Sequence, residues 1–65
     1  MKRGIVKFYN RDKGYGFITE EGTEKDYFVH ETGCDDAIAD GDRVTFDVGE
    51  GKKGPMAIEV KQDMG

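Results

Sequence analysis

The chain has 65 residues, of which 37% are charged, and a net charge of −4. A chain this short buries only about 60% of its accessible surface on folding, so we expect a single small domain over residues 1–65, of marginal stability. It contains no charged-then-apolar leader and no apolar run of about 20 residues, which predicts a cytoplasmic protein without a membrane partner. Its one cysteine, Cys34, excludes an internal disulfide.

The charge is unevenly distributed along the chain. Residues 1–19 carry five basic side chains against Asp12 alone (+4), residues 20–51 carry eleven acidic against two basic ones (−9), and the remainder is +1. A negative total argues against a nucleic-acid partner, because phosphate binding usually goes with a basic balance. The basic residues nevertheless gather around the first aromatic segment and in the last loop. Ordinary solvated lysines are the alternative interpretation.

The first predicted strand spans Gly4–Asn10, with Val6 directed inward and Lys7 outward. Strict alternation sends Phe8 inward too, so an outward Phe8 requires a local break such as a bulge. Phe8 and Tyr9 could also both belong to the core. The polar turn over residues 10–14 then places Arg11 and Lys13 at the edge of the next strand, where the phosphates of a bound chain would pass.

Two aromatic segments follow, Lys13-Gly14-Tyr15-Gly16-Phe17-Ile18 and Tyr27-Phe28-Val29-His30. The polar stretch over residues 20–25 suits a hairpin between strands at about 15–19 and 27–30. Period-two alternation puts the rings of Tyr15, Phe17, Phe28 and His30 on one outer face. Such exposure is costly unless something stacks there, and the bases of single-stranded nucleic acid are the natural candidates.

The glycines at 14 and 16 need a separate reason, since glycine weakens a strand. Close approach of another backbone, a bulge, or room for a base would each explain them, whereas a phosphate-cradling loop lacks its third glycine and its lysine. Asp26 precedes the second aromatic strand and either contacts base edges or closes the hairpin loop. His30 and Cys34 alone make no metal set, because structural zinc needs about four ligands.

The second half of the chain supplies most of the remaining core. In the acidic connection over residues 31–42, Ile38 is a predicted core anchor and Asp40-Gly41 a turn. A strand over Arg43–Val48 and a final strand follow, separated by a glycine-rich loop over 49–54 that presents Lys52 and Lys53, and residues 62–65 are expected to fray. Together the strands predict a closed five-stranded barrel. Its inward residues are Val6, Ile18, Tyr27, Val29, Val44, Phe46, Val48, Ile58 and Val60, with Met56 on the same face of the last strand.

Both aromatic segments, together with the Gly4–Asn10 opening and the Gly51–Pro55 run, resemble the cold-shock domain family over nearly the whole chain. The two aromatic segments look like that family's two ribonucleoprotein motifs. The resemblance implies an all-β, antiparallel five-stranded barrel of the oligonucleotide-binding type, with Phe8 on the binding face and Asp26 bonding to bases. This chain differs from the family pattern in three ways. Phe8 stands where tryptophan is common, Glu31 stands where a stacking phenylalanine is usual, and the following loop is shorter and lacks its aromatic residue.

We therefore expect a non-enzymatic, monomeric binder of single-stranded RNA or DNA without cofactor or metal, and the resemblance implies an RNA chaperone. A barrel whose aromatic face docks a polypeptide is the alternative, and an enzyme is the weakest reading because no nucleophile, base and orienting group occur together. Glu31 is expected near the rim of the ringed face, where it would repel the ligand. The predicted nucleic-acid contacts are Lys7, Phe8, Asn10, Arg11, Lys13, Tyr15, Phe17, Asp26, Phe28, His30 and Lys53.

Overall fold

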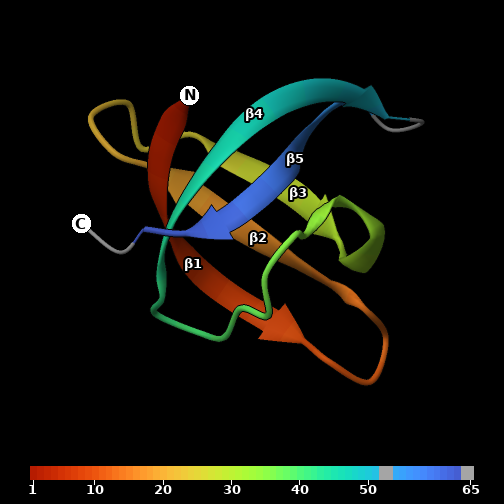
Figure 1. Ribbon diagram of the computed structural model, residues 1–65. Coiled ribbons are helices and arrows are strands. Elements are labelled where there is room, and N and C mark those ends of the chain that lie inside the picture. The colour runs from red at the N-terminus through yellow and green to blue at the C-terminus, as the bar shows by residue number, and fades with distance from the viewer. Residues whose placement is uncertain (52–53, 64–65) are drawn as a thin grey trace.

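The computed structural model, which describes residues 1–51 and 54–63, is a closed five-stranded barrel (Figure 1). Around the barrel the strands follow the order β1-β2-β3-β5-β4. The predicted all-β barrel is confirmed, although β3 and β5 pair in parallel, which the antiparallel prediction did not include. The elements are β1 (Lys2–Asn10), β2 (Tyr15–Glu20), β3 (Asp26–His30), the one-turn 3₁₀ helix η1 (Glu31–Gly33), β4 (Arg43–Gly51) and β5 (Gly54–Gln62).

A single apolar core fills the barrel. Tyr9, Tyr27 and Cys34 pack against it while remaining partly exposed. Seven of the predicted core positions are confirmed, among them Ile38, which the long connection contributes. Within the described ranges no helix is long and apolar enough to cross a membrane. The buried side chains are those of Val6, Ile18, Val29, Ile38, Val44, Phe46, Ala57 and Val60.

A bulge in β1 settles the orientation of its two aromatic residues. Val6 pairs with Ile18 and Phe8 with Phe17, so the register shifts by one residue at Lys7. A one-residue insertion reverses the face of every later side chain in the strand. Phe8 is therefore directed outward and is 38% exposed, while the next residue, Tyr9, packs on the core. The predicted break in alternation is confirmed, and of the two rings only that of Tyr9 is a core ring.

Gly14 and Gly16 have different reasons to be glycine. Gly14 ends the turn after β1 with φ +73°, a left-handed backbone conformation that residues with a side chain rarely adopt. Gly16 pairs with Tyr9, and a Cβ there would collide with the Phe8 carbonyl oxygen and lie 2.9 Å from the Tyr9 Cα. Close approach of a neighbouring backbone is thus the explanation for Gly16, and it is what lets Tyr9 cover the core at this point.

The predicted alternation in the last two strands is wrong at three positions. Val48 is 38% exposed; it lies beyond Phe46, the last β4 residue that pairs with β1, and pairs with Ala57 of β5. In β5, Glu59 adopts φ +51° and lies in a register shift against β4. This extra residue places Ala57 and Val60 in the core, whereas Met56 and Ile58, both predicted inward, are only partly buried.

The boundaries of β4 and β5 also differ from those predicted. Gly51 pairs with Gly54 and Glu50 with Pro55, so the strands extend into the predicted glycine-rich loop, of which residues 52 and 53 lie outside the described ranges. Gln62 belongs to β5 rather than to a frayed end. Its amide group donates to the Ala37 carbonyl at 2.8 Å, and its backbone N–H donates to a carboxylate of the 31–42 connection at 2.9 Å.

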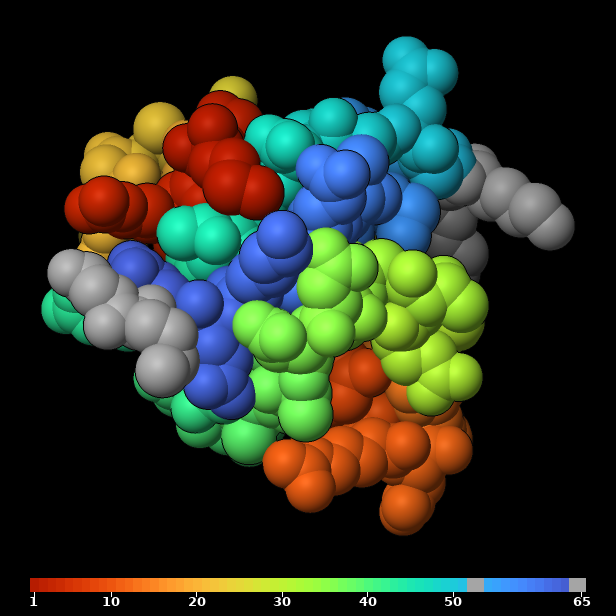
Figure 2. Space-filling view, viewed as in Figure 1, coloured from red at the N-terminus to blue at the C-terminus, as the bar shows by residue number. Residues whose placement is uncertain are grey.

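The connection over residues 31–42 is tied to the barrel along its length. Figure 2 shows it, in green, between the blue strand β5 and the orange turn that follows β1. The backbone N–H of Asp35 donates to the Val60 carbonyl at 2.8 Å, and the Asp40 carboxylate accepts from the Tyr9 N–H at 2.6 Å. Gly41, with φ +84°, forms the predicted turn into β4. The side-chain carboxylates of Asp36, Asp40 and Asp42 thus accept hydrogen bonds from backbone N–H groups.

Candidate nucleic-acid interface

Four aromatic rings from three neighbouring strands form a continuous outer surface, here called the aromatic face: Phe8, Tyr15, Phe17 and Phe28. Register brings them together, because Phe8 pairs with Phe17 across β1 and β2, and Phe17 pairs with Phe28 across β2 and β3. The ring centroids of Phe8 and Phe17 are 5.5 Å apart, and those of Phe17 and Phe28 are 5.8 Å apart. Tyr15 lies nearly parallel to Phe28, at 6.0 Å and 19°. The predicted ringed face exists.

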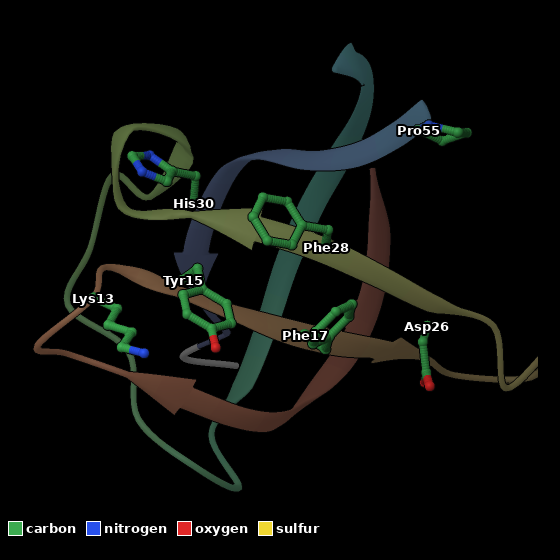
Figure 3. Close-up of a pocket in the computed structure, with 7 residues that line it drawn as sticks. All are labelled: Lys13, Tyr15, Phe17, Asp26, Phe28, His30 and Pro55. Atoms are coloured by element: carbon green, nitrogen blue, oxygen red, sulfur yellow. The ribbon is translucent and has the colours of Figure 1, made fainter. Parts of the chain in front are cut away.

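An open pocket, here called the aromatic pocket, lies over this face (Figure 3). In Figure 3 Lys13 stands at one end of β2 and Asp26 at the other, with the rings of Tyr15 and Phe17 between them. Pro55, which the sequence suggested only as the end of a loop, closes the side toward β5. Six predicted contact residues line this pocket together with Pro55: Lys13, Tyr15, Phe17, Asp26, Phe28 and His30.

Asp26 is held in place by two neighbours. Its carboxylate accepts a hydrogen bond from the Thr19 hydroxyl at 2.8 Å and from the Lys7 ammonium at 3.2 Å. The Thr19 hydrogen bond, followed by the Lys7 hydrogen bond, lowers the pKa of the Asp26 carboxyl. Asp26 lies in β3 rather than in the hairpin loop, and an ionised carboxylate has lone pairs left for donors on a ligand. Lys7, predicted as a phosphate contact, is here bound to Asp26.

His30 is fixed at the junction of β3 and η1. Its Nδ1 accepts the Thr32 backbone N–H at 3.3 Å, which makes His30 the N-cap of η1, and the Thr32 hydroxyl oxygen lies 3.0 Å from the same nitrogen. Because the backbone N–H can only donate, Nδ1 serves as the acceptor in this contact. The ring is thereby held in place and offers a flat surface to a ligand.

Two of the other predicted contacts, Asn10 and Arg11, do not line the aromatic pocket. Asn10 stabilises the turn, since its side-chain oxygen accepts the Lys13 backbone N–H at 3.1 Å. Arg11 is exposed and lines a different pocket, together with Tyr9, Glu31 and Cys34. Lys53 lies outside the described residues, so its placement stays a prediction. Of the three predicted phosphate contacts that the structure describes, Lys7, Arg11 and Lys13, the one that lines the aromatic pocket is Lys13.

Glu31 does not line the aromatic pocket. Its carboxylate packs against Gly14, where a Cβ would be 2.5 Å from Oε2, and it borders the pocket that contains Arg11.

Burial, aided by the nearby Asp35 and Glu31 carboxylates, raises the pKa of the Cys34 thiol in the same region. Among the residues that the structure describes, no three potential ligands lie close enough together to hold a metal ion.

A second pocket adjoins the first on the β5 side. Phe28, His30 and Pro55 border both pockets. The additional lining residues are Thr32, Gly51, Gly54 and Met56, none of them predicted as a contact from the sequence. We call it the Met56 pocket. Alternation had assigned Met56 to the core, although it directly follows the Gly54-Pro55 pair that ends the predicted glycine-rich loop.

Comparison with known proteins identifies the family. The family model described as the 'Cold-shock' DNA-binding domain matches residues 2–62. The chain belongs to the cold-shock domain family. It is 48% identical over 63 residues to a cold shock-like protein of Aquifex aeolicus (strain VF5), covering 91% of this chain and 90% of that protein. The cold shock-like protein CspE of Escherichia coli (strain K12) is 45% identical over 62 residues, covering 89% and 90% of the two chains.

A third relative, the cold shock protein of Arthrobacter globiformis, is 42% identical over 64 residues, covering 92% of this chain and 96% of that protein. The cold-shock domain family is one that binds nucleic acids, and the predicted resemblance is confirmed. Nucleic-acid binding by this family gives a chemical reason for the exposed rings of the aromatic face.

Proposed function

We propose that this protein binds single-stranded RNA or DNA on its aromatic face and acts as an RNA chaperone in the cytoplasm, without enzymatic activity. The observation that carries the proposal is the set of outward rings in cross-strand register, open to the aromatic pocket. Each base stacked on an aromatic side chain contributes about 1–3 kcal/mol to binding. We assign this role to Phe8, Tyr15, Phe17, Phe28 and His30.

The polar residues around the rings support a strand passing from one end of β2 to the other. Lys13 at one end provides a cation for phosphates, and we assign the same role to Lys7, Arg11 and Lys53. Asp26 at the other end offers a carboxylate to base amino groups, and Asn10 is assigned contacts to bases or sugars. The net charge of −4 is compatible with this, since the acids Asp36, Asp40 and Asp42 lie in the 31–42 connection and do not line the aromatic pocket.

Chaperone activity follows from mass action. A protein that binds only unpaired strands shifts a hairpin toward its open form by as much as its affinity for the two forms differs. A weak stem therefore opens at protein concentrations above the dissociation constant, while a strong stem does not. The proposed role requires binding that is sequence-tolerant, and stacking provides this because every base has a flat face.

The test is a titration of the protein with single-stranded pyrimidine and purine oligomers, followed by tyrosine fluorescence. Saturable quenching supports the proposal, whereas silence at high oligomer concentration would favour a protein-docking barrel. A hairpin RNA with a weak stem, labelled with a fluorophore and a quencher, then tests the chaperone role. Opening by the wild-type protein, but not by a folded Phe17→Ala/Phe28→Ala variant, is the expected result.

A further inference from the structure

Met56 continues the row of outward rings across the barrel. Phe8 pairs with Phe17, Phe17 with Phe28, and Phe28 with Met56. Residues directly opposite each other on neighbouring strands lie on the same face of a sheet. The thioether of Met56 is therefore the fourth member of a transverse row that crosses β1, β2, β3 and β5.

The Met56 pocket has the size and lining of a site for a flat apolar group. Its volume is about 520 Å³, within the range of about 300–1,000 Å³ typical of ligand pockets. Among the residues that the structure describes, its lining is formed by rings, glycines, a proline, a threonine and the Met56 thioether, a mostly apolar set that suits a flat base. Since Phe28, His30 and Pro55 are shared with the aromatic pocket, a strand stacked on Phe28 can continue into it.

The glycines of the β4–β5 hairpin leave the thioether accessible. The Met56 Sδ lies 2.5 Å from the position that a Gly51 Cβ would occupy, so the sulfur rests over a residue without a side chain. Gly54 likewise adds none. A polarizable thioether makes favourable contacts with aromatic rings and adapts its three rotatable bonds to rings of different shape.

We propose that the Met56 pocket is a nucleobase subsite, in which the base next to the one on Phe28 packs against the Met56 thioether. This inference rests on the proposed function and adds a contact residue from β5. The sulfur–ring contact predicts a loss of about 2- to 10-fold in affinity when the side chain is truncated.

The first test uses the wild-type protein labelled with ¹³C at its methionine methyl groups, titrated with an oligothymidylate. Ring currents of the packed base should shift the Met56 methyl signal as tyrosine fluorescence saturates. Met1, which is 71% exposed and lines neither pocket, serves as an internal control and should not shift. A Met56 methyl signal that is unmoved at saturation overturns the inference.

The second test compares Met56→Ala, Met56→Leu and the control Val48→Ala, at an exposed residue that lines neither pocket, over oligomers of four to eight nucleotides. The wild-type protein should gain affinity at one length where Met56→Ala does not, while Met56→Leu retains most of the gain and Val48→Ala all of it. If Met56→Ala fails to fold, Met56→Leu and the methyl titration decide. Equal length series for wild type and a folded Met56→Ala overturn the subsite alone, whereas absence of binding at every length overturns the proposed function.

Discussion

The replacement Phe28→Ala tests the aromatic face most directly, because Phe28 contacts two other rings and borders both pockets. We expect the variant to lose about 1–3 kcal/mol of binding free energy to a single-stranded oligomer, which is about 5- to 150-fold in the dissociation constant. The reason is that Phe28 pairs with Phe17 on one side and with Met56 on the other, so its ring is flanked by members of the row on both sides.

The same replacement should lower stability as well. The variant lacks two ring contacts of Phe28: the stacked contact with Tyr15 at 6.0 Å and the edge contact with Phe17 at 5.8 Å. At about 0.5–1.5 kcal/mol for each aromatic pair, the loss is about 1–3 kcal/mol. A chain of this length has a total stability of about 3–10 kcal/mol, so the variant should remain folded at low temperature.

Binding is best measured by fluorescence anisotropy of a labelled pyrimidine oligomer, because Tyr15 emission itself changes when its stacking partner is removed. Circular dichroism establishes a temperature at which the variant is folded. Val48→Ala is the matched control, since Val48 is 38% exposed and borders neither pocket. A folded Phe28→Ala protein that binds within twofold of wild type refutes the assignment of this face.

Three further predictions concern charge. If about four cations contact a single strand, log affinity should fall against log salt with a slope of about −2 to −3, and a slope near zero removes the assigned cations from the site. The pKa of Asp26 is lowered by Thr19 and then by Lys7, so its stabilisation is present above the unfolded-state pKa of about 3.9 and is lost as pH falls through the lower folded value. Urea unfolding should show the stability gap between wild type and Asp26→Asn closing on acidification, and a pH-independent gap contradicts this. Glu31→Gln should tighten binding only at low salt, and Glu31→Phe no more than Gln, because this side chain packs on Gly14 rather than beside the rings. A gain specific to Glu31→Phe that persists at high salt places position 31 on the aromatic face.

The aromatic face could be predicted because the pairing of β2 with β3 contains no irregularity. Tyr15 pairs with His30 and Phe17 with Phe28, so period-two alternation holds from one strand into the next. The short connection between β2 and β3 fixes this register, and the sequence allows that connection to be recognised. The outward orientation of Phe8 was predictable only through family resemblance, because the bulge at Lys7 has no clear local signal.

The β4–β5 hairpin shows where pattern reasoning fails. Val48 continues the alternation of Val44 and Phe46, yet it is 38% exposed and lies beyond the part of β4 that pairs with β1. How far the pairing with β1 extends along β4 depends on the length of β1, which is distant from Val48 in the sequence. Likewise, nothing in the Ile58-Glu59-Val60 sequence indicates that Glu59 adopts a left-handed φ and shifts the register, although this one residue decides that Ala57 and not Ile58 is buried.

The same register shift bears on the binding face. Without it, Met56 would be directed inward as alternation predicts, and the transverse row would end at Phe28. The family pattern draws attention to Glu31, where a ring is absent, but the Glu31 carboxylate packs on Gly14 and borders a different pocket. A nucleic-acid strand that leaves Phe28 toward β5 meets the Met56 pocket, whose described lining is mostly apolar. If the Met56 pocket binds a base, the bulge at Glu59 is the backbone feature that directs Met56 outward and so extends the binding path to the β4–β5 hairpin.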